Sequence, residues 1–380
     1  MTRPFLAYGR QWIEDDDVAA VAAATTSDHL TTGPYVARLE RDLCAATTAR
    51  HAVAMNSGTA ALHAAYAAAG LGPGRELVTS PLTFAATANA ALYLGASVRF
   101  ADVSSDTGNL DPAAAAAAIG PRTGLVTAVD YAGHPADYPA LRTAIGGRCR
   151  LVADAAHAIG SALAGRPAGT LGDLTCLSFH PVKTITTGEG GAVLTDDAQM
   201  AAYAARFRSH GIERDLAAMP GAEGPWWYEQ RELGFNYRIT DIQCALGSSQ
   251  LAKLGAFVTR RREIAARYNA AFAGIAGLEL PATRTGAKPA GHLYALRVRD
   301  AGRRRPLFER LRALGLGVQV HYIPVYWHPF YQQLGYRRGM CPIAEDFYAR
   351  EISLPMYPRL SDGEIASVIE RVLEAVRELL

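Results

Sequence analysis

Between residues 50 and 200 the chain alternates short, apolar, β-prone runs with helical stretches rich in alanine. The predicted strands are residues 52–55, 76–79, 98–102, 125–130, 151–154, 175–179 and 192–195. The predicted helices include residues 59–69, 85–94, 112–119 and 138–145, and residues 196–210 are expected to form the helix that closes this block. Strands separated by helices of this length form βαβ units, whose strands run parallel and are buried on both faces. The sequence therefore predicts an α/β fold with a mainly parallel sheet of seven strands.

The rest of the chain predicts a second, smaller domain. Because 380 residues exceed the size at which a single hydrophobic core usually stops growing, two domains are expected, at residues 1–250 and 251–380. Segment 213–231 is rich in Gly, Pro and aromatic residues and predicts a long ordered loop that covers something or packs on a partner. Further helices are expected at 239–257, 260–272, 306–314 and 362–380, and further strands at 292–298 and 317–321. This mixture is typical of an α+β domain.

Charge and cysteine content exclude several classes of function. Lysine and arginine (38) nearly balance aspartate and glutamate (36), so nothing electrostatic favours nucleic acid or an anionic membrane as a partner. The five cysteines form no CxxC pair and no metal-ligand spacing, so no metal site is expected. Scattered cysteines fit a reducing cytoplasm, and the N-terminal residues contain no apolar stretch suited to a signal peptide. A cytoplasmic protein is expected.

Lysine is scarce in this chain. It occurs only at Lys183, Lys253 and Lys288, so an imine-forming amine has three candidates. Lys183 follows a predicted strand and precedes a glycine-rich turn, among apolar neighbours that include Val182 and Ile185. Desolvation there would lower the pKa of the amine and make it a usable nucleophile. Lys253 and Lys288 are better explained as surface charges.

Two further groups of polar residues follow predicted strands. After residues 52–55, the turn at Gly58 opens a helix whose exposed N–H groups and positive dipole end could bind an anion, although Ser57 could also be a plain N-cap. Asp154 ends another strand, where α/β sheets bind ligands, and its carboxylate could keep a ring nitrogen protonated or cap the next helix. His157 lies three residues later, either beside the same ligand or as a buried histidine.

An anion site, a carboxylate and a lysine at the carboxyl ends of three strands match the needs of one cofactor. In pyridoxal phosphate the phosphate needs an anchor, the pyridine nitrogen needs a carboxylate that keeps it protonated, and the aldehyde needs a lysine with which it forms an imine. The three elements together therefore predict a pyridoxal phosphate site at Lys183.

Five segments carry a family resemblance over essentially the whole chain. They are NSGTAALH, PLTFAATANAALYLGA, ADAAHAIG, SFHPVKTITTGEGGAVLT and GFNYRITDIQCALG, in this order. The set resembles the sugar aminotransferases of the DegT/StrS family. The resemblance implies the fold type I aminotransferase architecture, pyridoxal phosphate as the cofactor, and a homodimer with active sites at the subunit interface.

The resemblance also implies roles for individual residues. Lys183 would be the Schiff-base lysine and proton shuttle, Asp154 the partner of the pyridine nitrogen, and His157 a neighbour of the phenolic oxygen. The other implied cofactor contacts are Gly58, Thr59, Ala60 and Ser178 at the phosphate, Phe84 stacked on the ring or packed in the core, and Asn236 from the other subunit. His180 and Arg238 are implied substrate contacts. Dehydratase relatives carry histidine in place of Lys183, so the lysine favours transamination.

Segments 131–138, 178–191, 208–212 and 320–336 look closest to one subgroup, the C4-aminotransferases of pseudaminic acid biosynthesis. They imply pocket roles for His321, Tyr322 and Tyr326, whose alternative is a packed aromatic turn. The chain departs from the subgroup at 326–328, where it has Tyr-Trp-His and members often have His-Leu-Gln.

The implied activity is ping-pong transfer of an amino group, with glutamate as donor, to a keto group, at C4, of a nucleotide-linked keto-deoxy sugar. Amination of a keto-cyclitol and a non-catalytic regulator that binds pyridoxal phosphate stay open as alternatives. The lack of a basic DNA-binding module argues against the regulator.

Overall fold

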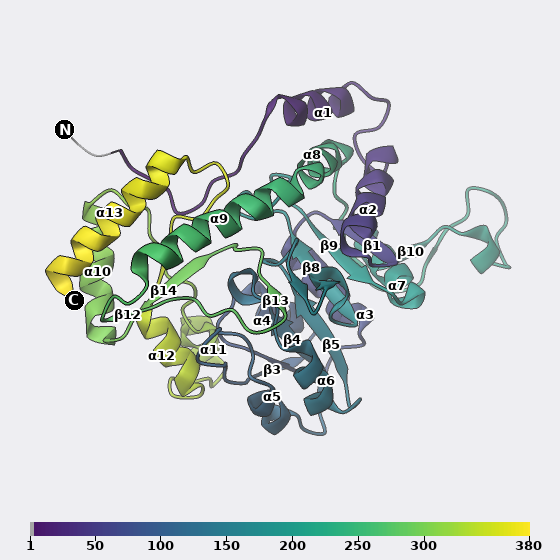
Figure 1. The fold of residues 1–380 in the computed structure, drawn as a ribbon. Helices are drawn as coiled ribbons and strands as arrows, with labels where there is room; N and C mark the ends of the chain where they lie inside the picture. Colours follow the sequence, from purple (N-terminus) through teal and green to yellow (C-terminus); the bar gives the residue numbers. More distant parts are fainter. Residues whose placement is uncertain (1–3) are drawn as a thin grey trace.

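The computed structural model describes residues 4–380, and a seven-stranded sheet lies at its centre (Figure 1). In spatial order its strands are β1 (His51–Met55), β9 (Gly191–Thr195), β8 (Leu174–Ser178), β5 (Arg150–Asp154), β4 (Thr123–Val129), β2 (Glu76–Thr79) and β3 (Ser97–Phe100). Strands β8, β5, β4, β2 and β3 pair in parallel, and β9 pairs antiparallel with β8 and β1. Because β9 alone is reversed, β1 points the same way as the five parallel strands. The predicted α/β fold is confirmed, and its seven strands are the seven expected.

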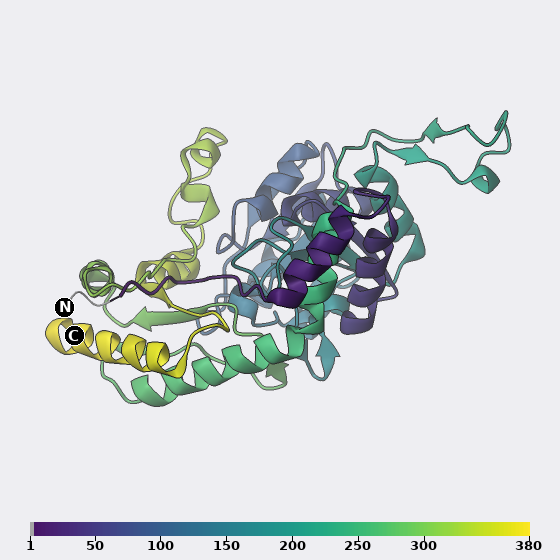
Figure 2. The ribbon, with the colours of Figure 1, turned by 90° about the horizontal axis from the view of Figure 1, so that it is seen from above.

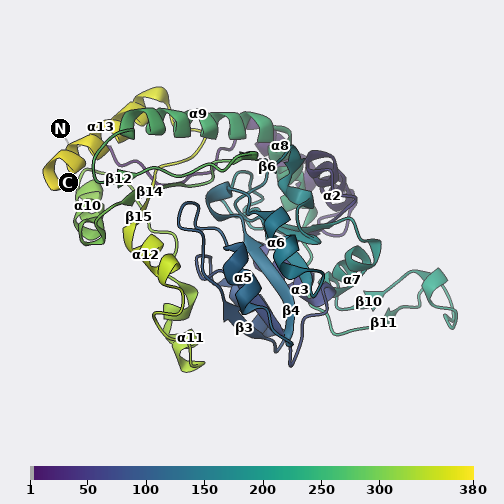
Figure 3. The same cartoon turned by 60° about the horizontal axis from the view of Figure 1, so that its bottom comes forward.

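Helices cover both faces of this sheet (Figure 3). They are α2 (Pro34–Thr47), α3 (Gly58–Ala68), α4 (Ala86–Tyr93), α5 (Pro112–Ala118), α6 (Tyr138–Ile145), α7 (Ala198–Arg208) and α8 (Asp241–Ala252), and α1 (Asp15–Thr25) packs on α8. Successive strand residues alternate between two hydrophobic clusters: Leu125 packs with α3, α4 and α7, whereas Val126 packs with α2, α5, α6 and α8. The strands read as continuous apolar runs because both of their faces are buried.

The long helix α9 (Leu254–Phe272) leads from this sheet to a second layer. There β12 (Leu278–Glu279), β14 (Tyr294–Val298) and β15 (Glu351–Leu354) form a three-stranded sheet with α10 (Ala301–Ala313), α11 (Pro329–Gln333), α12 (Pro342–Arg350) and α13 (Asp362–Leu379) nearby. A third hydrophobic cluster fills this part, whereas Tyr326, Tyr331 and Phe347 belong to a cluster of the large sheet. The domain boundary at residue 250 stays a prediction.

The smaller elements complete the chain. They are β6 (Ala162–Leu163), β7 (Arg166–Pro167) and β13 (Ala287–Lys288) in one sheet, the pair β10 (Ile212–Glu213) and β11 (Glu229–Gln230), and the short 3-10 helices at Tyr131–Gly133, Ala168–Thr170, Leu216–Ala218 and Val325–Trp327. Strands β10 and β11 begin and end a long extension that projects from the body of the protein (Figure 2). The expected loop 213–231 therefore spans most of a hairpin, and Trp226 within it is 72% exposed.

Three expectations for individual segments were wrong. The single helix predicted over residues 239–257 is divided between two helices, since α8 ends at Ala252 and α9 begins at Leu254. Lys253 is not a surface charge: its side chain is 16% exposed and forms ion pairs with Asp16 and Asp17. Residues 317–321 form no strand, since the pairing there is a single bridge from Gln319. Within residues 4–380 no helix is long and apolar enough to cross a membrane.

Candidate active site

The carboxyl ends of β1, β5 and β8 lie at the same edge of the sheet, beside a cavity of about 500 Å³. The structure brings ten of the expected site residues to its wall: Gly58, Thr59, Phe84, Asp154, His157, Ser178, His180, Lys183, His321 and Tyr322. They come from segments more than 250 residues apart in the chain, so this cavity is the candidate active site.

The turn after β1 is tightly packed against its neighbours. Ser57 caps α3 by accepting the N–H of Ala60 at 3.1 Å, which leaves the N–H groups of Gly58 and Thr59 for a ligand. A Cβ on Gly58 would lie 2.8 Å from the Cβ of Ser178, so only glycine fits at this approach to β8. Ala60 is buried and does not line the cavity. Both readings of Ser57-Gly58 therefore hold together: a capped helix start that still offers two donors.

The Asp154 carboxylate is buried and hydrogen-bonded on both oxygens. The Thr87 hydroxyl donates to Oδ2 at 2.6 Å, and the N–H of Ala156 donates to Oδ1 at 3.2 Å. Thr83 and Thr87 share a further hydrogen bond of 2.6 Å. Burial raises the pKa of Asp154, while the bond from Thr87, the bond from Ala156 and the charge of Lys183 lower it. Sequence reasoning missed Thr87, although it lies inside the PLTFAATANA segment.

The Lys183 amine lies in this cavity, as the apolar neighbours in its sequence suggested. Burial lowers the pKa of the amine from 10.5 to about 8, and the charge of Asp154 opposes this shift. The loop is held by its own backbone, because the N–H of Lys183 donates to the carbonyl of His180 at 2.9 Å and that of Thr187 to Phe179 at 3.0 Å. A buried amine of this kind is partly unprotonated near neutral pH and can act as a nucleophile or base.

The imidazole of His157 is neutral, and one of its two ring nitrogens has no hydrogen-bond partner within residues 4–380. Burial lowers its pKa well below the usual value, and the nearby charges of Lys183 and His321 add to this effect. Its Nε2 lies 3.0 Å from the Tyr322 hydroxyl, whereas its buried Nδ1 has no hydrogen-bond partner within residues 4–380. Such an unsatisfied buried atom indicates a missing ligand group.

Besides Ala60, three expected site residues do not line this cavity. Tyr326 is fully buried, its hydroxyl donates to Glu345 at 2.7 Å and its ring packs on Phe100, which fits the packed aromatic turn that was the alternative to a pocket role. Asn236 is exposed and Arg238 half-buried, and neither lines the cavity of its own chain. Their predicted roles would need a second subunit.

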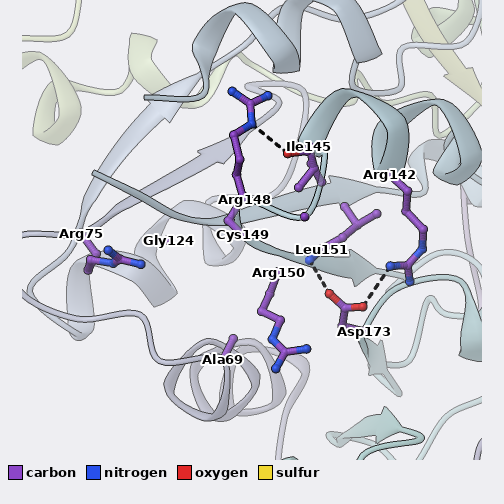
Figure 4. Close-up of a pocket in the computed structure, with 11 residues that line it drawn as sticks. Ala69, Arg75, Gly124, Arg142, Ile145, Arg148, Cys149, Arg150, Leu151 and Asp173 are labelled. Carbon is purple, nitrogen blue, oxygen red and sulfur yellow. Dashed lines mark hydrogen bonds and ion pairs between the residues drawn. The ribbon is translucent and has the colours of Figure 1, made fainter. Parts of the chain in front are cut away.

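A second large cavity, of about 580 Å³, lies at the opposite edge of the sheet and is lined by four arginines (Figure 4). Two of them have structural partners: Arg148 donates to the carbonyls of Ala144 and Ile145 at the end of α6, and Arg142 pairs with Asp173. Cations at helix C-termini stabilise the helix dipole. Its lining includes Asp173 and Cys149 but no lysine or histidine, so it lacks the buried amine and the imidazoles of the first cavity.

The residues of the candidate site fit pyridoxal phosphate. Phe84, 65% exposed, presents an aromatic face to the cavity and is not a core residue. Two N–H groups at the start of α3 are free to bind an anion. Asp154 lines the same cavity, and Nδ1 of His157 has no hydrogen-bond partner within residues 4–380. A planar, anionic, nitrogen-containing ring would satisfy all four features.

Known proteins resemble this chain along nearly its full length. Residues 11–373 match the model of the DegT/DnrJ/EryC1/StrS aminotransferase family. The chain is 39% identical to the spore coat polysaccharide biosynthesis protein SpsC of Bacillus subtilis, over 98% of this chain and 97% of that protein. It is 36% identical to the UDP-4-amino-4,6-dideoxy-N-acetyl-beta-L-altrosamine transaminase of Campylobacter jejuni, over 98% and 99%.

Solved structures agree. Helicobacter pylori PseC, an aminotransferase involved in the biosynthesis of pseudoaminic acid, superposes with a TM-score of 0.92 at 31% identity, over 99% of this chain and 100% of that one. A sugar aminotransferase structure from Streptococcus pneumoniae, solved in PLP and PMP forms, gives TM-scores of 0.92 and 0.93 at 28% and 29% identity, with both chains fully covered. The chain belongs to the DegT/DnrJ/EryC1/StrS aminotransferase family, whose cofactor is pyridoxal phosphate.

Proposed function

We propose that the chain is a sugar aminotransferase that transfers the amino group of L-glutamate to the C4 keto group of a nucleotide-linked keto-deoxy sugar, in a ping-pong cycle. The observation that carries the transamination is the pairing of Lys183 and Asp154 in one cavity, together with the family match. The sugar assignment is supported by the similarity to a UDP-sugar transaminase and to PseC.

The chain's own residues divide the work as follows. Pyridoxal phosphate, when bound, supplies an electron sink next to the reacting carbon. Asp154 would keep the ring nitrogen protonated, and the turn at Gly58 and Thr59, with Ser178, would anchor the phosphate. Lys183 would take and return a proton at the reacting carbon, which suits an amine with a pKa of about 8. His157 would contact the ring oxygen through the nitrogen that has no protein partner.

Substrate contacts are proposed at the wall of the cavity away from the sheet. His180, His321 and Tyr322 line this region. Arg238 would bind a carboxylate or diphosphate, since a guanidinium can hold either through two hydrogen bonds.

A substrate comparison tests the proposal. Purified protein loaded with pyridoxal phosphate is given glutamate and either a UDP-linked 4-keto-6-deoxy-N-acetylhexosamine or a keto-inositol, and the aminated product is measured by mass spectrometry. We expect product from the sugar nucleotide and none from the keto-inositol. Lys183→Ala is the inactive control. Faster turnover of the keto-inositol would overturn the sugar assignment.

We also propose a homodimer in which Asn236 and Arg238 complete the cavity of the other subunit. This is supported by their absence from the cavity wall of their own chain and by the projecting extension between β10 and β11 (Figure 2). Mixing Lys183→Ala with Asn236→Ala subunits tests it. Only a shared site lets two inactive variants restore activity, to about a quarter of wild type with random pairing of subunits in a twofold dimer. Mixtures that stay inactive while light scattering finds dimers would refute the shared site.

A further inference from the structure

Two residues of β15 bind His321 from the side that does not face the cavity. The backbone N–H of His321 donates to Glu351 Oε2 at 2.7 Å, and the ring Nδ1 lies 2.8 Å from the Ser353 hydroxyl. Glu351 Oε1 and the Ser353 hydroxyl form a third hydrogen bond. Glu351 and Ser353 are two apart on one strand and therefore lie on the same face. These three hydrogen bonds link Glu351, Ser353 and His321 into a closed circuit, which fixes both the backbone and the ring of His321.

The carboxyl group of Glu351 is expected to be neutral in this circuit. Glu351 and Ser353 are completely buried, and within residues 4–380 the Glu351 carboxyl group forms no ion pair with a Lys, Arg or His side chain. An unpaired buried carboxylate is costly, so such a group takes up a proton instead. Burial accordingly raises the pKa of Glu351 to about 8, against the bonds from Ser353 and His321 and the charge of Arg304.

A neutral carboxyl group fixes the direction of the other hydrogen bonds. A protonated Glu351 carboxyl group can donate its O–H to the Ser353 oxygen instead of accepting the Ser353 O–H, and the Ser353 hydroxyl then donates to Nδ1 of His321. Burial lowers the pKa of His321 to about 4, so the ring is neutral and carries one proton. With Nδ1 as the acceptor, that proton is on Nε2, at the ring edge turned away from Ser353 and left for the cavity.

We propose that Glu351 and Ser353 are positioning residues that lock His321 as its Nε2–H tautomer, which donates a hydrogen bond to an oxygen of the keto-sugar substrate. The substrate half of this inference rests on the proposed function, whereas the tautomer half does not. An ionised Glu351 would reverse the circuit: Ser353 would donate to the carboxylate, Nδ1 would carry the proton, and Nε2 would face the cavity as an acceptor. The two states therefore predict opposite hydrogen-bonding roles for His321.

Nitrogen NMR on protein labelled with 15N-histidine distinguishes these states without any substrate. The signals of His321 are assigned by their loss in His321→Gln. We expect a protonated Nε2 and an unprotonated Nδ1 at pH 7. Glu351→Gln should keep this tautomer, because its amide N–H donates to Ser353 and its carbonyl accepts the N–H of His321. A protonated Nδ1 in the wild-type protein would overturn the proposal.

Ser353→Ala removes the link between carboxyl and ring, so the His321 signals should move towards a mixture of tautomers. Asp130→Asn is the matched control, because Asp130 is a second fully buried carboxyl group that donates and accepts no bond with His321. It should leave the His321 signals unchanged. If Ser353→Ala does not fold, the wild-type and Glu351→Gln spectra still decide the question.

Steady-state kinetics test the substrate half. Losing one hydrogen bond should raise the KM for the keto sugar about threefold to tenfold in Ser353→Ala, with the KM for glutamate unchanged. Equal KM values for the sugar would overturn the donor role of His321. A protein that has the predicted tautomer but aminates no keto sugar would refute the proposed function and leave the circuit supported.

Discussion

Replacing Thr87 by valine removes the hydroxyl that donates to Asp154 and keeps nearly the same shape. The bond is 2.6 Å long, and both residues are at most 5% exposed. A hydrogen bond to a charged group contributes about 1.5–3 kcal/mol. Its loss raises the pKa of Asp154 further, in the direction in which burial already moves it. A carboxyl group that has become protonated no longer favours the protonated ring nitrogen of the cofactor.

The expected result is a loss of affinity for pyridoxal phosphate of about ten- to a hundredfold, because each 1.4 kcal/mol corresponds to a factor of ten. Titration of the cofactor-free protein, followed by tryptophan fluorescence, measures it. Thr175→Val is the matched control: Thr175 is also fully buried in the large sheet, but its hydroxyl has no hydrogen-bond partner within residues 4–380 and does not line the cavity. Equal affinities of Thr87→Val and wild type, or an equal loss in Thr175→Val, would refute the reasoning.

Three further predictions concern the same cavity. In Lys183→Met, the absorbance of the bound cofactor should vanish. The free energy of unfolding of the cofactor-free protein at pH 7 should rise by about 3 kcal/mol. The reason is that an amine with a pKa of about 8 in the folded state and 10.5 in the unfolded state destabilises the fold below pH 8. This gain in stability should shrink as the pH rises from 8 to 10.5. Thermal melts at several pH values measure it, and a gain that stays constant over this range would contradict the prediction. Tyr322→Phe removes the partner of His157 and should slow turnover about threefold to tenfold at unchanged melting temperature; unchanged kcat would count against the contact. Gly58→Ala forces a Cβ to within 2.8 Å of Ser178 and should cost about 1–3 kcal/mol in stability along with cofactor affinity, so normal cofactor binding would show that the turn can widen.

The strands and the cofactor motifs were predictable because each depends on residues close together in the chain. All seven strands of the large sheet were found within about two residues, since strands buried on both faces form continuous apolar runs bounded by turns. The break at Lys253 was not predictable from periodicity, because it coincides with ion pairs to Asp16 and Asp17, more than 200 residues earlier. Residues 317–321 resemble a strand for the same local reasons, yet they have only one paired residue.

The site was predictable in its cofactor half and less so in its surroundings. Thr87 escaped notice because a threonine on a helix carries no signal until the fold places it against Asp154. Tyr326 has the same local sequence context as Tyr322, but only the packing of Phe100 and Glu345 decides that it points into the core. Asn236 and Arg238 do not line the cavity of their own chain, and their predicted roles would need a second subunit.

The reversed strand β9 has a consequence for how the protein emerges from the ribosome. Among residues 4–380, β1 pairs only with β9, with His51 opposite Thr195, so the strand that precedes the turn at Gly58 stays unpaired until nearly 200 residues have been made. Loop closure over such a distance is slow, and an apolar strand with a free edge invites pairing with other chains. A nascent chain cut short before residue 191 would therefore lack β9 and leave β1 without its partner strand.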